Sequence, residues 1–203
     1  MQIMTYISVL FLVVPIIVIL INNLFSRQLA ERISFYLAGA AAIIQIAASA
    51  ADFFLLPLYN LHEYKFSLLW NFKKPGSEYF AVNSLSLVIL FCIGLVSLVS
   101  VLIGKHTIDR KKIAYVNLLM TLLFGMNGML IVTDLFSLYV FLEIVGISSF
   151  VLISMFKSDT GLEGAFKYLV MSSLASIFIL TGLAFVFMQT GSLQYQDVST
   201  YIL

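Results

Sequence analysis

The strongest constraint on this chain is a stretch of apolar residues, 113–156, that is about twice as long as one membrane crossing requires. A transmembrane helix takes about 20 mostly apolar residues. The stretch therefore predicts a helical hairpin. Its natural break is Thr133-Asp134, because Thr and Asp favour helix N-caps. Two helices are predicted, 113–132 and 135–156.

Four further apolar runs are long enough to cross a membrane: 3–25, 33–58, 80–103 and 162–188. Their continuous apolar character is typical of helices, whereas membrane strands alternate. The chain is 62% hydrophobic and 10% charged, while a soluble domain is about 25% charged. The sequence predicts an all-α integral membrane protein with six transmembrane helices. They form one membrane domain over 1–203, with 189–203 as an outer tail or connector.

The first run differs from a signal peptide, because no basic segment precedes it and no small-residue cleavage site follows it. Pro15 within it predicts a kink that membrane helices tolerate. We therefore expect a retained first helix.

Basic residues are concentrated in the loops after the first, third and fifth predicted helices. These loops hold Arg27, Arg32, Lys105, Arg110, Lys111, Lys112 and Lys157, whereas the other loops hold Lys65, Lys73 and Lys74. Cytoplasmic loops of membrane proteins carry the excess of Lys and Arg. The bias predicts a multi-pass protein of the cell inner (plasma) membrane with both termini outside.

Several classes of function are disfavoured. The net charge of +1, without a long basic run, gives no basis for binding nucleic acid. One cysteine, Cys92, and two histidines in separate polar segments predict no metal site and no haem or iron–sulfur cofactor. The sequence has no phosphate-binding loop and no nucleophile paired with a base, so we expect no catalytic chemistry of its own.

Glu143 is the strongest functional candidate. It follows Asp134 by nine residues, which places it ~13 Å into a hydrocarbon core of about 30 Å. Ionisable groups at that depth are costly and mark proton relays and ion pathways. The alternative is a protonated Glu that makes one structural hydrogen bond between helices.

Lys167 is the second candidate for proton transfer. It lies a few residues inside the predicted helix 162–188. The alternative is a lysine whose ammonium extends to the membrane interface. Because Lys167 and Glu143 lie at different depths on neighbouring helices, a water-bridged link is easier than a direct ion pair.

Uncharged polar residues could extend a polar path. The candidates are Ser148, Ser149, Ser172 and Asn117. They suggest that the helices 135–156 and 162–188 face each other through polar side chains, although small hydroxyls often serve packing alone. Asp52 favours an interfacial carboxylate near a helix end over a functional one.

Two segments carry a family resemblance. They are DLFSLYVFLEIVGISSFVLI, residues 134–153, and EGAFKYLVMSSLASIFILTG, residues 163–182, the latter followed by TGSL at 190–193. The chain resembles the antiporter-like subunits of complex I, of Mrp-type sodium/proton antiporters and of membrane-bound hydrogenases. NSLSL at 83–87 is similar to a further family stretch, with Asn83 in place of the usual Asp.

The resemblance implies a role for two residues and for the whole chain. Glu143 matches the family's fifth-helix glutamate, a member of its proton-transfer chain, and Lys167 matches the sixth-helix lysine. The chain would then translocate H⁺, with or without Na⁺, within a membrane hydrogenase, quinone oxidoreductase or antiporter complex. Family members have about fourteen helices, so the resemblance implies a split half, similar to their N-terminal part, whose later helices come from another membrane subunit.

Two other functions remain open from the sequence. One is a structural or assembly subunit of such a complex that does not pump. The other is an independent small-solute carrier, which requires matched broken helices in two halves. We rank the carrier last because no internal repeat is visible.

Overall fold

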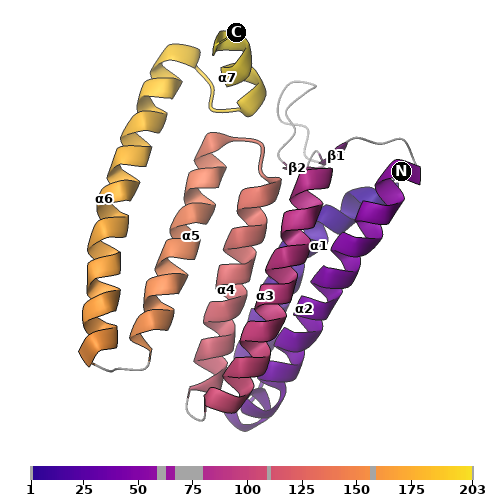
Figure 1. The fold of residues 1–203 in the computed structure, drawn as a ribbon, viewed down its shortest axis with the longest axis vertical. Coiled ribbons are helices and arrows are strands. Elements are labelled where there is room, and N and C mark those ends of the chain that lie inside the picture. The colour runs from indigo at the N-terminus through magenta and orange to yellow at the C-terminus, as the bar shows by residue number, and fades with distance from the viewer. Residues whose placement is uncertain (1, 59–62, 67–79, 109–110, 156–158, 203) are drawn as a thin grey trace.

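The computed structural model describes residues 2–58, 63–66, 80–108, 111–155 and 159–202. The helices are α1 (Gln2–Leu24), α2 (Arg27–Leu58), α3 (Ser84–Thr107), α4 (Lys112–Ile131), α5 (Leu135–Ser154), α6 (Asp159–Thr190) and α7 (Tyr195–Ile202). Two short antiparallel strands, β1 (Glu63–Phe66) and β2 (Phe80–Asn83), pair with Glu63 opposite Asn83. The long helices stand roughly side by side, and both termini lie at the same end of the bundle (Figure 1).

Five helices of the described chain, α2 to α6, are long and apolar enough to cross a membrane, and α1 contributes a shorter apolar stretch, Leu10–Leu24. The prediction of an all-helical, multi-pass membrane protein is therefore confirmed. Both termini at one end fit an even number of crossings.

The predicted helix boundaries were wrong where polar residues continue a helix or where an apolar run begins as a strand. The predicted helix 80–103 starts only at Ser84, because 80–83 pair with β1 instead. α2 starts at Arg27 rather than at 33, and an ion pair of 3.2 Å between Arg27 and Glu31 joins its first turns. Hydropathy identifies the membrane-embedded part of a helix, whereas the helix itself extends into polar sequence.

The predicted tail 189–203 also contains structure. α6 extends to Thr190, and α7 follows it. Five of the predicted residues lie outside the described part of the chain: Lys73, Lys74, Arg110, Phe156 and Lys157.

The break at Thr133-Asp134 is confirmed. α4 ends at Ile131, and the Asp134 carboxylate caps α5 by accepting a hydrogen bond of 2.7 Å from the Ser137 backbone N–H. The segment before α7 returns to this break: the Tyr195 N–H donates to the Thr133 carbonyl at 3.1 Å, and the Leu135 N–H donates to the Leu193 carbonyl at 3.0 Å. These bonds hold the α6–α7 connection against the α4–α5 turn.

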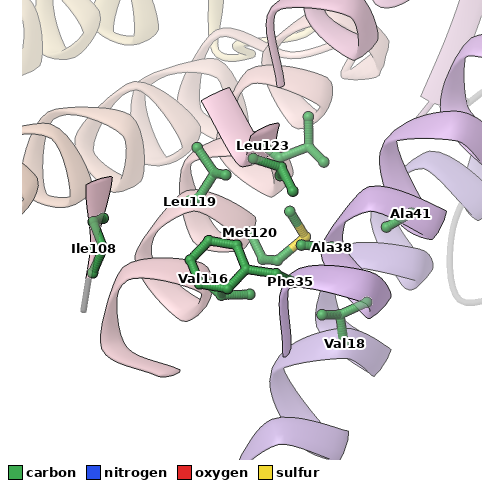
Figure 2. Close-up of a cluster of buried hydrophobic side chains, with 10 residues drawn as sticks. Val18, Phe35, Ala38, Ala41, Ile108, Val116, Leu119, Met120 and Leu123 are labelled. Carbon is green, nitrogen blue, oxygen red and sulfur yellow. The ribbon is translucent and has the colours of Figure 1, made fainter. Parts of the chain in front are cut away.

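The main apolar core lies among the first four helices. It is formed by Val18, Phe35, Ala38, Ala41, Val101, Ile108, Val116, Leu119, Met120 and Leu123, most of which Figure 2 labels. α5 packs on α4, and α6 packs on α5 at the edge of the bundle (Figure 1). The buried residues of α6 are Ala165, Ser176 and Leu183, so most of its surface is open.

A buried amide pair, Gln45 with Asn127, joins the four core helices. The two side chains donate to each other at 3.0 Å and 2.9 Å. Gln45 also donates to the Leu90 carbonyl at 3.0 Å, and Asn127 donates to the Phe11 carbonyl at 2.9 Å. Pro15 has no N–H to offer Phe11, four residues earlier, so Asn127 supplies the donor that the proline removes.

Candidate functional site

Glu143 lies in the middle of α5, in the part of the helix that its distance from the Asp134 cap places near mid-membrane. Its side chain is partly buried. The Oε1 atom is shielded from solvent and has no hydrogen-bond partner among the described residues. A buried carboxylate oxygen without a donor is costly in hydrocarbon, so this group requires a proton, water or a further partner.

The neighbours of Glu143 along α5 show which way it faces. One turn before it, the Tyr139 hydroxyl lies 3.2 Å from the donating Ser176 hydroxyl of α6. Almost one turn after it, Gly146 contacts α6, since a Cβ at Gly146 would lie 3.3 Å from the Ser172 Oγ. Residues spaced by three or four share one side of a helix. Glu143 is therefore on the side of α5 that faces α6.

The predicted polar contact between these two helices thus consists of Glu143, Tyr139, Ser172 and Ser176. We call it the α5–α6 polar contact. Tyr139 was missed by sequence reasoning, although its spacing of four residues from Glu143 was visible. Gly146 was missed too, and its lack of a side chain gives the Ser172 hydroxyl room against α5.

Lys167 does not meet Glu143 in the structure. Its Nζ lies 2.5 Å from the Glu163 Oε1, and both side chains are largely exposed, at 71% and 64%. The buried residue of this turn is Ala165, which faces α5. Lys167 and Glu163 therefore form an ion pair on the open side of α6.

The other predicted polar residues separate into different places. Ser172 lies at the α5–α6 polar contact. Asn117 instead bonds to α1, with Asn22 donating to it at 3.1 Å and Asn117 donating to Asn23 at 3.3 Å.

Ser148 and Ser149 donate to the carbonyls of Ile144 and Val145 in their own helix. Such local bonds satisfy the hydroxyl within one turn. The predicted path is therefore not a continuous row in the described structure.

Asp52 is more enclosed than its expected interfacial position suggested. Its side chain is 3% exposed within α2, and its Oδ1 has no hydrogen-bond partner among the described residues. As for metals, the described residues contain no group of three His, Cys, Asp or Glu side chains that could hold an ion.

The fold and Glu143 together define a multi-pass membrane protein with an ionisable group inside a helix pair. Residues 132–203 match the family described as NADH:quinone oxidoreductase/Mrp antiporter, transmembrane region. This match covers α5, α6 and α7, including the α5–α6 polar contact. The resemblance to antiporter-like subunits is thereby confirmed.

Curated relatives agree with the family match. The chain is 37% identical over 89 residues to NADH-quinone oxidoreductase subunit N 2 of Thermodesulfovibrio yellowstonii, covering 43% of this chain and 20% of the relative. It is 28% identical over 136 residues to the D-type Na(+)/H(+) antiporter protein of Alkalihalophilus pseudofirmus, covering 66% of this chain and 28% of the relative. The chain thus spans less than a third of the length of these relatives.

Solved structures share the fold. A chain of the Mrp complex from Dietzia sp. matches with a TM-score of 0.80 at 21% identity, covering 99% of this chain and 39% of its own length. A chain of an archaeal membrane-bound sulfane sulfur reductase matches with a TM-score of 0.79 at 22% identity, covering 98% and 40%. Both solved structures are membrane complexes, and the likeness establishes the arrangement of the helices.

Proposed function

We propose that this chain is part of an ion-translocating, antiporter-like subunit in which the Glu143 carboxyl group takes up and releases protons. The observation that carries the proposal is the buried, unpaired Oε1 of Glu143 at the α5–α6 polar contact. A carboxyl group in this position gains little from remaining charged without a partner, and it becomes stable when a proton or a cation arrives. The residues around it lie within the segment that matches the antiporter family.

The α5–α6 polar contact gives the proton a direction from which to arrive. The Tyr139 and Ser176 hydroxyls are within hydrogen-bond distance of each other across the two helices. A hydroxyl donates one hydrogen bond and accepts others, so it can pass a proton between waters or side chains. We propose that Ser172, Ser176 and Tyr139 hold the water that exchanges protons with Glu143.

Lys167 has a different role in this proposal. Its exposed position beside Glu163 offers an ion pair to whatever covers the open side of α6. We propose that further helices pack there, in the assembled complex, and that they bring the ionisable partner which Glu143 lacks. They belong to another membrane subunit or to a further stretch of the same polypeptide. The transported ion is H⁺, alone or in exchange for Na⁺.

The test compares variants in membrane vesicles that carry the assembled complex. Glu143→Gln keeps the shape but cannot ionise, so proton uptake, followed by a pH-sensitive dye, should fall by at least about tenfold, as for loss of a general acid–base group. Glu143→Asp should retain part of the activity. Asp197→Asn, an exposed carboxylate of α7, is the matched control and should transport normally.

A second function is favoured by the separation of Lys167 from Glu143. In this alternative the chain is a structural or assembly subunit that does not pump. Glu143→Gln complexes would then transport normally and assemble normally on native gels. That result would contradict the proton-transfer role, and the loss of transport with intact assembly would exclude the structural role.

A further inference from the structure

A basic groove lies at the end of the bundle opposite the termini, where α2 begins, α3 ends and α4 begins (Figure 1). Its volume is about 680 Å³. The charged residues in its lining are Glu31, Arg32, Lys105 and Lys112. Since three cations face one carboxylate, the lining carries a net charge of +2, and the loop bias assigns this end of the bundle to the cytoplasm.

The single carboxylate of the groove is already engaged. Glu31 accepts from the Arg27 Nε at 3.2 Å, outside the groove lining. Lys105 is held at the groove by Tyr36, with its Nζ 4.5 Å from the ring centroid and 3.5 Å from the hydroxyl oxygen. None of the ion pairs given for the described residues neutralises Arg32 or Lys112. The groove therefore offers cations to an anion.

The backbone adds to this preference. α4 begins at Lys112, and its N-cap residue, Lys111, makes no side-chain capping bond. The first N–H groups of a helix carry partial positive charge and favour phosphate-type anions. This helix end lies beside the Lys112 side chain in the groove lining.

The apolar surroundings indicate the kind of anion. Tyr36 is 66% exposed, and Leu102 and Ile103, one turn from Lys105 toward the middle of α3, are 55% and 60% exposed. A ligand whose phosphate lies on the cations would therefore have its apolar part along exposed aliphatic residues. Tyr at this level is typical of the membrane interface.

From these observations we propose that the groove binds the headgroup of an anionic phospholipid. Arg32, Lys105 and Lys112 contact the phosphate, and Leu102 and Ile103 contact the start of an acyl chain. Basic pockets between transmembrane helices are a recurrent form of lipid headgroup site. The site is more than 20 residues from Glu143 in sequence on every lining element, and its test does not depend on transport.

The experiment measures lipid binding to the full chain in detergent by native mass spectrometry, with phosphatidylglycerol and phosphatidylcholine as the probes. The wild type should retain phosphatidylglycerol preferentially. The triple variant Arg32→Gln, Lys105→Gln, Lys112→Gln should bind it roughly 100-fold more weakly, from about fivefold per cation. Phosphatidylcholine binding should not change.

Two matched variants keep the test decisive. Arg32→Lys, Lys105→Arg, Lys112→Arg retains the charges and should bind as the wild type does, which separates charge from folding. Arg27→Gln with Lys111→Gln removes two nearby cations outside the groove lining and should reduce binding less than about threefold, below the loss expected for one cation of the groove.

Three results would overturn the proposal. One is equal retention of both lipids by the wild type. Another is unchanged phosphatidylglycerol binding in the triple Gln variant. The third is displacement of the lipid by millimolar inorganic phosphate or by an acidic peptide, which would assign the groove to a soluble anion or to a partner protein.

Discussion

The amide pair Gln45–Asn127 allows a quantitative test of what holds the first four helices together. Replacing Asn127 by Leu removes three hydrogen bonds, two with Gln45 and one with the Phe11 carbonyl. Hydrogen bonds between membrane helices are worth about 0.6 kcal/mol on average in double-mutant cycles. We therefore expect Asn127→Leu to lower the free energy of unfolding by ~2 kcal/mol, a factor of about 30 in the equilibrium constant.

The double-mutant cycle sharpens this prediction. Gln45→Leu also removes three bonds, the two shared with Asn127 and the one to the Leu90 carbonyl. The double variant removes four distinct bonds, so it should lose ~2.4 kcal/mol rather than the ~3.6 kcal/mol that two independent changes would give. The difference of about 1.2 kcal/mol is the coupling through the two shared bonds.

The measurement is reversible unfolding in mixed micelles of dodecylmaltoside and SDS, followed by circular dichroism. Pro15→Ala provides a further arm, because the restored N–H can donate to the Phe11 carbonyl. In that background the cost of Asn127→Leu should fall by about one hydrogen bond, ~0.6 kcal/mol. Strict additivity of Gln45→Leu and Asn127→Leu would refute the coupling, and the structural role of the pair with it.

Three further predictions concern other parts of the fold. A Cβ at Gly128 would overlap ring carbons of Phe141, so Gly128→Ala should destabilise by about 1–3 kcal/mol; at Gly164, where no described atom lies within 4 Å, the same change should be neutral or stabilise by up to ~1 kcal/mol, both measured by the same unfolding assay. Asp134→Ala should lose about 0.5–2 kcal/mol by removing the α5 cap, and Asp134→Asn should retain most of it. Burial, and secondly the Asp134 carboxylate, raise the pKa of Tyr195; the folded state thus favours the neutral phenol, and this stability is present below the ordinary pKa of about 10 and is lost as pH rises through the higher folded value. Tyr195→Phe should therefore flatten the alkaline decline of stability, and an unchanged decline would contradict this.

The sequence was sufficient for the large features of the fold because membrane crossing imposes length and hydropathy directly. The hairpin break at Thr133-Asp134 could be predicted since the cap residue is local to the turn it makes. The strand at 80–83 could not, because its apolar residues pair with β1 across a long loop, and hydropathy contains no information on that partner.

Side-chain partners were harder to predict than helices. Asn117 and Asn127 were recognised as polar residues of one helix, but their partners, Asn23 and Gln45 among them, come from α1 and α2. The signal that could have pointed to Asn127 is Pro15, whose missing N–H leaves a buried carbonyl in need of a donor. Finding that donor requires the packing of α1 against α4, which one sequence does not specify.

Lys167 shows the same limit at the candidate site. Its depth on the helix could be read from the sequence, whereas its direction depends on the rotation of α6 against α5. Ala165, Ser176 and Leu183 face inward, which turns Lys167 to the open side and pairs it with Glu163. A helical spacing of four residues made that local ion pair available at little cost in side-chain order.

The contrast between the two polar regions of the bundle bears on where function lies. Gln45 and Asn127 satisfy each other and two backbone carbonyls, so both amides are committed to packing. Glu143 has a shielded oxygen without a donor in the described chain, on the open and less buried side of the bundle. A satisfied buried group stabilises one arrangement, whereas an unsatisfied one responds to what binds it. A polar residue committed to packing should tolerate a change of proton availability, and Glu143 should not, so proton-dependent behaviour is expected from α5 and α6 rather than from the first four helices.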